Sequence, residues 1–257
     1  MTRTAARLPA AFLAALVAAA LLAACGDGRP APPAPSVGLT QDRPVDPSVA
    51  TAALTDEDGR PLALASLRGH VVVLASFLTS CQEVCPLTTG AFLTLRHDLA
   101  AAGLAHQVDL VEVTVDPERD DPARLAAYAR LSGTDWPLLT APAPTLAAFW
   151  RFFGAYYQKV PEGSPPGLDW QTGRPYTYDV DHSDLLVVLD ASGHERFVTE
   201  GLPDVGGRLP DRLRRLLDSQ GLANLAHPGQ GSWTASDLRQ AVAWVLGRPV
   251  PAAGPGG

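Results

Sequence analysis

Two cysteines and a distant histidine are the residues of this chain best suited to chemistry. Cys81 and Cys85 lie in the segment TSCQEVCP, and His182 lies in YDVDHSDLLVVLD. Residues four apart on a helical turn share one face about 6 Å apart, so the two thiols can act together or join in a disulfide. Two thiolates and one imidazole form a soft donor set that suits copper, since thiolate favours Cu(I) and imidazole tolerates Cu(II). Zinc is the competitor, but a structural zinc site takes four protein ligands and the sequence offers no fourth.

The segments around the cysteines place them at a strand end and a helix start. Residues 70–78, HVVVLASFL, form a continuous apolar run that predicts a strand buried on both faces. Residues 86–102 predict a helix with Pro86 in its first turn. Helix N-termini carry partial positive charge and free N–H groups, which lower the pKa of nearby thiols and favour thiolate. An inert buried pair or a structural disulfide is the alternative, but a disulfide here would constrain little chain.

The remaining segments predict an α/β fold of the thioredoxin-like kind. In chain order they are a strand at 108–115, helices at 121–131 and 144–156, strands at 185–189 and 194–199, and helices at 209–219 and 234–246. This order gives a central mixed sheet flanked by helices, with an extra C-terminal helix. If the strand at 185–189 runs antiparallel to the first two, its beginning shares their C-terminal edge. His182 then faces the two cysteines.

Two carboxylates are predicted near the same edge of the sheet. Asp116 ends the second strand, in VDPERD, and Asp181 immediately precedes His182. Acidic residues also favour the first turn of the helix that follows, because helix N-termini attract negative charge. Asp116 therefore has two interpretations, as a residue beside the site or as one member of an acidic cluster at a helix start.

The N-terminal residues predict secretion and lipid attachment. Arg3 and Arg7 precede an apolar run, and the sequence LAAC ends at Cys25, whose thiol would take the lipid and which becomes the new N-terminus when residues 1–24 are cleaved. An uncleaved membrane anchor is the alternative, but residues 10–24 as a helix span about 22 Å, less than the roughly 30 Å hydrocarbon core. We therefore expect a protein anchored by lipid at the extracytoplasmic face of the cell membrane.

Composition divides the rest of the chain. Residues 25–49 are rich in Pro and Ala and predict a lipid-anchored tether, residues 50–220 the folded thioredoxin-like domain, and residues 221–257 a C-terminal extension with one amphipathic helix. Lys and Arg number 20 against 27 Asp and Glu, which gives a net charge of −7. An acidic chain with no basic cluster excludes nucleic acid as an expected partner.

Three motifs together resemble the Sco/SenC family of membrane-attached copper proteins. They are TSCQEVCPLTT, VTVDPERDDPARLAAYA and DVDHSDLLVVLDASG, which occur in the family's order within roughly residues 50–220. The resemblance implies a thioredoxin fold that binds copper through Cys81, Cys85 and His182, with Asp116 and Asp181 around the site. It also implies a role in assembling the CuA centre in subunit II of cytochrome c oxidase.

Three functions fit these residues. The first is a metallochaperone, not a conventional enzyme, that passes copper to subunit II of cytochrome c oxidase or another copper-receiving protein. The second is a thiol–disulfide oxidoreductase in which Cys81 and Cys85 form a disulfide when oxidised. The third is a redox or copper sensor. The C-x3-C spacing, and His182 where such reductases carry a cis-proline, favour copper over reduction.

Overall fold

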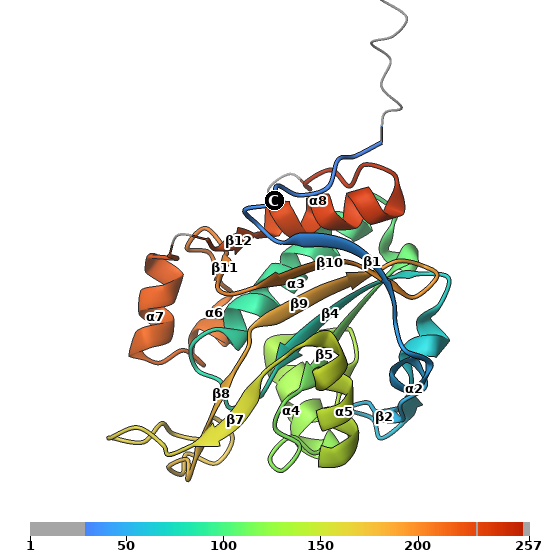
Figure 1. Cartoon of the computed structure of the whole chain (residues 1–257). Helices are drawn as coiled ribbons and strands as arrows, with labels where there is room; N and C mark the ends of the chain where they lie inside the picture. Colours follow the sequence, from blue (N-terminus) through green and yellow to red (C-terminus); the bar gives the residue numbers. More distant parts are fainter. Residues whose placement is uncertain (1–28, 230, 254–257) are drawn as a thin grey trace, which may run out of the picture.

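The computed structural model describes residues 29–229 and 231–253 (Figure 1). The expected signal peptide at 1–24 and the expected lipidation site Cys25 lie outside these residues. Among the residues it describes, no helix has both the length and the apolar character needed to cross a bilayer.

A six-stranded mixed sheet forms the centre of the fold. In sheet order its strands are β1 (Leu39–Pro44), β10 (His194–Glu200), β9 (Leu185–Leu189), β4 (Val71–Phe77), β5 (Val108–Thr114) and β6 (Leu138–Leu139). β4 is buried along its whole length, as its continuous apolar sequence predicts. β4, β5 and β6 are parallel to one another, whereas β9 is antiparallel to β4 and β10 is antiparallel to β9.

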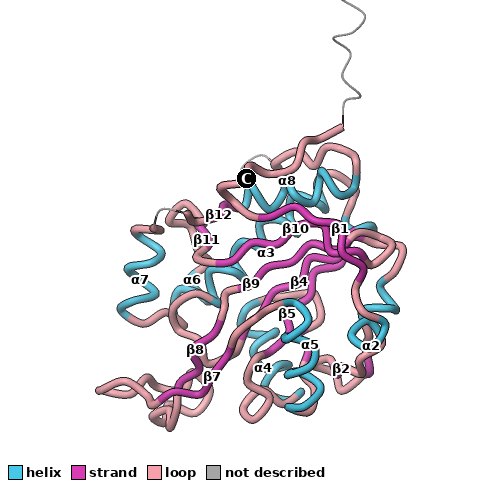
Figure 2. Tube along the Cα trace, viewed as in Figure 1, coloured by secondary structure: helices cyan, strands magenta, loops and turns pink. Residues whose placement is uncertain are grey.

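Helices flank this sheet, so the predicted thioredoxin-like α/β class is confirmed (Figures 1 and 2). The helices are α2 (Pro47–Ala50), α3 (Cys85–Ala101), α4 (Pro122–Ser132), α5 (Ala143–Phe153), α6 (Asp211–Arg214), α7 (Ser219–Ala226) and α8 (Ala235–Leu246). α8, the expected extra C-terminal helix, packs against α3 and contacts β4 and β9. Its apolar face buries Leu238, Ala241 and Val242 in the core.

Short elements lie outside the central sheet. They are the antiparallel pairs β2 (Leu54–Thr55) with β3 (Pro61–Leu62) and β7 (Tyr157–Val160) with β8 (Asp179–His182), the parallel pair β11 (Pro203–Asp204) with β12 (Trp233–Thr234), and the 3-10 turns at Leu64–Leu67 and Ala105–Gln107. The loop 161–178 between β7 and β8 projects from the body of the domain (Figure 2).

The predicted helix at 209–219 is wrong. The chain forms two separate helices there, α6 and α7, which begin after Pro210 and Asp218. The Asp218 side chain accepts a hydrogen bond from the Gly221 N–H at 2.8 Å, so this residue starts a new helix instead of ending an old one. The C-terminal region therefore contains α7 as well as α8, and α7 crosses the predicted boundary at residue 220.

The expected tether at 25–49 ends earlier than predicted. Residues 39–44 form edge strand β1, which pairs with β10, and Asp46 caps α2. The sequence LTQDRP has no apolar period because β1 is largely exposed, and it is held by backbone pairing and by Arg43. The Arg43 Nε donates to the buried Glu195 carboxylate at 2.8 Å.

A buried carboxylate ties α3 to β5. Glu112 of β5 is wholly buried and accepts hydrogen bonds from the Thr89 hydroxyl of α3 at 2.8 Å and from the Trp136 indole at 2.9 Å. Burial raises the pKa of Glu112 to about 7, although both hydrogen bonds oppose this. Thr89 lies one turn after Cys85, so this contact also holds the first turns of α3 in place.

The substitution Glu112→Gln tests this buried acid. The raised pKa of Glu112 stabilises the folded wild type below about pH 4.5, and that contribution is lost as pH rises to about 7. The amide oxygen can accept from the Trp136 indole while the amide NH2 donates to the Thr89 hydroxyl, so both contacts can form without a charge. We expect the variant's unfolding free energy, relative to wild type, to rise by roughly 2 kcal/mol between pH 5 and pH 7.5. Urea unfolding at several pH values measures this, and a difference that does not change with pH would contradict it.

Candidate metal centre

The structure brings Cys81, Cys85 and His182 together. Cys81 lies on the turn between β4 and α3, Cys85 begins α3, and His182 ends β8. One ligand atom from each of the three residues lies within 4.8 Å of the others, and Cys85 Sγ is 3.8 Å from His182 Nε2. β9 is antiparallel to β4, so the chain enters β9 at the edge where β4 ends, as the sequence analysis required for His182 to face the cysteines.

The start of α3 shapes the cysteine loop. Cys81 Sγ accepts from the backbone N–H of Cys85 at 3.3 Å and lies 3.5 Å from the N of Val84. These N–H groups have no partner within the helix at its first turn, so they are free to stabilise a thiolate.

His182 is held in one orientation by its backbone neighbour. Its Nδ1 lies 3.0 Å from the Ser183 carbonyl oxygen. A carbonyl can only accept, so Nδ1 carries a hydrogen and, in the neutral ring, Nε2 presents its lone pair toward Cys85. The Ser76 hydroxyl of β4 donates to the same Ser183 carbonyl at 2.7 Å and accepts from the Leu185 N–H at 3.0 Å. The sequence analysis missed Ser76, whose apolar surroundings conceal its role.

The two thiols differ in burial and in acidity. Cys81 is half-buried and Cys85 is buried, and both are free cysteines in this structure. A hydrogen bond from Cys85 holds the pKa of Cys81 well below its usual range, with help from His182 and against the effect of burial. Burial raises the pKa of Cys85 well above its usual range, and the Cys81 sulfur adds to the increase. Cys81 is therefore the more acidic thiol of the pair.

His182 and a carboxylate that the sequence analysis missed share this environment. Burial lowers the pKa of His182, but the hydrogen bond with Cys81 and its charge outweigh burial and raise that pKa to about 9. Asp184 Oδ1 lies 3.9 Å from His182 Nδ1, and burial raises the pKa of Asp184 to about 7. Asp184 was missed because it follows His182 by two residues at the beginning of an apolar strand.

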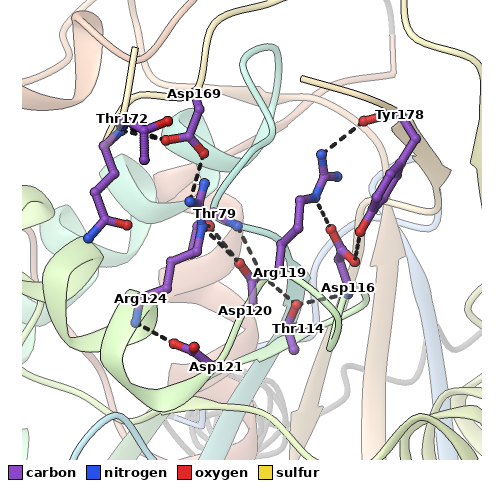
Figure 3. A network of polar contacts seen from close by, with 11 residues as sticks. Thr79, Thr114, Asp116, Arg119, Asp120, Asp121, Arg124, Asp169, Thr172 and Tyr178 are labelled. Carbon is purple, nitrogen blue, oxygen red and sulfur yellow. Dashed lines mark hydrogen bonds and ion pairs between the residues drawn. The ribbon is translucent and has the colours of Figure 1, made fainter. Parts of the chain in front are cut away.

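The two predicted carboxylates lie in different surroundings. Asp181 is exposed, lies opposite Gln158 in the β7–β8 pair, and lines the same cavity as Cys81 and His182. Asp184, in the two-residue link between β8 and β9, is the carboxylate that pairs with His182. Asp116 is buried, pairs with Arg119 and accepts from the Tyr178 hydroxyl at 2.9 Å (Figure 3). Since Arg119 also donates to the Tyr178 carbonyl, Asp116 holds the segment leading into β8.

A third carboxylate fixes the strand ends beneath the cysteine loop. Asp120 is wholly buried and accepts from the Thr79 N–H at 3.1 Å, the Thr79 hydroxyl at 2.5 Å and the Thr114 hydroxyl at 2.6 Å (Figure 3). Thr79 follows β4 and Thr114 ends β5, so Asp120 ties the two strand ends together. Asp120 is the last residue of the segment VDPERD, and its role was not predicted because its contacts are set by the fold.

The cluster opens, on the side of Cys81 and His182, onto a cavity of about 860 Å³. Cys81 and His182 lie on its wall, and segments of the loop 161–178, together with Arg119 and several carboxylates, line the rest. The long Pro-containing loop before His182 therefore forms one side of the cavity without separating His182 from the cysteines.

Fold and site together define a thioredoxin-like protein that carries a thiol, thiol and imidazole cluster at its sheet edge. The SCO1/SenC family model matches residues 42–201, more than half of the chain. The chain therefore belongs to the SCO1/SenC family.

Individual relatives agree with this assignment. The chain is 29% identical over 141 residues to the mouse mitochondrial SCO2 homolog, covering 55% of this chain and 51% of the relative. It is 31% identical over 100 residues to the SCO1 homolog of Bacillus subtilis, covering 38% and 51%. It is 26% identical over 153 residues to a protein of Stutzerimonas stutzeri named for copper binding, covering 60% and 69%. The chain thus spans about half the length of the SCO1 and SCO2 relatives.

Solved structures of Sco proteins are similar to this one. Copper-bound ScoI of Bradyrhizobium japonicum superposes with a TM-score of 0.48 at 22% identity, covering 73% of this chain and 98% of the other. Apo Sco1 of Thermus thermophilus superposes with a TM-score of 0.49 at 26% identity, covering 74% and 93%.

The difference between the thiols predicts unequal reactivity. In the reduced apo protein at pH 7, we expect iodoacetamide to alkylate Cys81 at least about tenfold faster than Cys85, because Cys81 is both more exposed and more acidic. Peptide mass spectrometry over time gives both rates. Cys85→Ser should retain the fast reaction and Cys81→Ser should lose it. Equal rates for the two thiols would contradict the assignment.

Proposed function

We propose that this protein is a copper metallochaperone. Cys81, Cys85 and His182 hold copper as cargo and deliver it to a copper-receiving protein. The observation that carries the proposal is the convergence of two sulfurs and one imidazole nitrogen within 4.8 Å of one another. Membership of the SCO1/SenC family and the copper-binding name of the Stutzerimonas relative support copper as the metal.

The donor set suits copper better than a structural zinc ion. Cys81 offers a thiolate, and the orientation of His182 turns its Nε2 toward the sulfurs. Thiolates favour Cu(I), and an added imidazole also accommodates Cu(II). Among the described residues the cluster has three members, whereas a structural zinc site is closed by four.

The cavity gives the site the access that transfer requires. A chaperone must release its metal by exchanging ligands one at a time with the receiving protein, so the metal needs an open side. The cavity of about 860 Å³ provides that side next to Cys81 and His182. Its wall carries Glu83, Asp179 and Asp181, whose combined negative potential favours an approaching cation.

The proposal also covers the protein that receives the copper and the place where transfer occurs. We propose that copper goes to the CuA-bearing subunit II of cytochrome c oxidase or to another copper-receiving protein on the extracytoplasmic side. The family resemblance supports the first choice. The lipoprotein-like sequence ending at Cys25 supports a lipid anchor at the membrane surface.

Thiol–disulfide exchange is the second candidate function. The acidic, more exposed Cys81 and the buried Cys85 match an attacking thiolate and a resolving thiol. Cys81 Sγ would attack a target disulfide to form a mixed disulfide and release one target thiolate. Attack by Cys85 would then release the second thiolate and leave a Cys81–Cys85 disulfide, so each molecule would reduce one target disulfide.

His182→Ala separates the two functions. We expect the reduced wild-type protein to bind one copper per chain with thiolate-to-Cu(II) charge-transfer absorption. The variant should lose at least about tenfold in copper affinity, since it loses one of three ligands. Copper titration with visible absorption and metal analysis measures both. His106→Ala, an exposed histidine on the same chain, is the matched control and should bind like wild type.

The results of these titrations distinguish the chaperone from the thiol–disulfide oxidoreductase. If the folded, reduced wild-type protein does not bind copper tightly, the chaperone proposal is overturned. If that protein nevertheless reduces a target disulfide, and His182→Ala does so equally well, the thiol–disulfide function replaces it.

A further inference from the structure

A helix beyond the family-matched residues lies directly on the cysteine loop. α7 (Ser219–Ala226) follows the matched segment 42–201 in the chain. The backbone N–H of Asp218, the residue that caps α7, donates to the Gln82 carbonyl at 3.0 Å. Gln82 lies between the two cysteines, so the C-terminal part of the chain contacts the backbone of the proposed metal loop.

Gly221 lets the two backbones approach this closely. A Cβ at this position would lie 2.2 Å from the Gln82 carbonyl oxygen and 3.1 Å from the Glu83 Cα, both closer than normal contacts allow. Glycine inside a helix costs about 1 kcal/mol relative to alanine, so helix formation alone disfavours it here. The close packing of α7 on the loop accounts for a glycine at this position.

A small apolar cluster holds α7 in this position. Leu225 of α7 and Leu217 before it are buried together with Leu87 of α3, apart from the main core. Leu87 lies two residues after Cys85, in the first turn of α3. α7 and the residues just before it therefore contact both the loop between the cysteines and the helical turn that follows the second cysteine.

We propose that α7 is a positioning element of the thiol pair. The loop from Cys81 to Cys85 is held on its inner side by the backbone N–H contacts to Cys81 Sγ and on its outer side by Asp218 and Gly221. Displacing the Gln82–Glu83 backbone would move the following N–H groups away from the sulfur. The effect of α7 on copper binding rests on the proposed function. Its effect on the thiol–disulfide equilibrium does not.

Gly221→Ala is the direct test. If α7 did not touch the loop, alanine would simply stabilise the helix. If it does, the added methyl group displaces the loop and weakens the N–H contacts that stabilise reduced Cys81. We expect the equilibrium constant for reduction of the Cys81–Cys85 disulfide by dithiothreitol to fall about three- to tenfold, the effect of losing one hydrogen bond. The charge-transfer spectrum of the copper-loaded protein should also change.

Gly229→Ala is the matched control. Gly229 lies three residues after α7, is exposed, and has nothing within 4 Å of the position of a Cβ. The same chemical change at this site should leave the dithiothreitol equilibrium and the copper spectrum as in wild type. Circular dichroism and thermal unfolding establish that each variant is folded.

A second pair of variants covers the case in which Gly221→Ala does not fold. Asp218→Ala removes the side chain that caps the Gly221 N–H and loosens the first turn of α7 without adding bulk against the loop. We expect it to shift both readouts in the same direction as Gly221→Ala. Asp218→Asn keeps a good capping side chain and should restore the wild-type equilibrium.

The results separate this inference from the proposed function. If folded Gly221→Ala and Asp218→Ala match wild type in both readouts, α7 does not position the loop and the inference is overturned, whether or not copper binds. If the wild type binds no copper but both variants shift the thiol equilibrium relative to Gly229→Ala, the positioning role stands and the copper function fails.

Discussion

The antiparallel pairing of β9 with β4 is the constraint on which the site depends. Because β4 runs toward the cysteine loop and β9 runs away from it, the end of one strand and the beginning of the other meet at a single edge of the sheet. The Ser76 hydroxyl fastens this meeting point by donating to the Ser183 carbonyl and accepting from the Leu185 N–H. His182 directly precedes Ser183, whose carbonyl this hydrogen bond holds, and its Nε2 lies 3.8 Å from Cys85 Sγ.

Buried carboxylates stabilise the edge on either side of this meeting point. A buried charge is costly unless hydrogen bonds or an opposite charge compensate it. Asp120 has three hydrogen bonds from the ends of β4 and β5, and Asp116 has Arg119 and Tyr178. These contacts rigidify the frame, whereas Cys81 and His182 face an open cavity. A firm support beneath an open site is the arrangement that a protein needs if it must hold a metal and also release it.

Much of the fold followed from the sequence because its apolar segments have clear periods. β4, α3 and β9 were predicted to within about a residue, and His182 was placed beside the cysteines on the condition that the strand at 185–189 is antiparallel to β4, which it is. The failures have physical causes. β1 is a polar edge strand, and α6 and α7 are divided by a capping residue within one leucine-rich stretch. Ser76 and Gly221 act through partners distant in the chain, and the contact of Asp184 with His182 depends on the link between β8 and β9, so no local pattern reveals them.

X-ray absorption spectroscopy of the copper-loaded protein tests the central claim most directly, because it reports the atoms bound to the metal. Two sulfur ligands and one imidazole nitrogen around the copper are the result that the geometry of Cys81, Cys85 and His182 predicts. A copper site with no sulfur ligands, or with both sulfurs but no imidazole, in protein that is folded and reduced would contradict it.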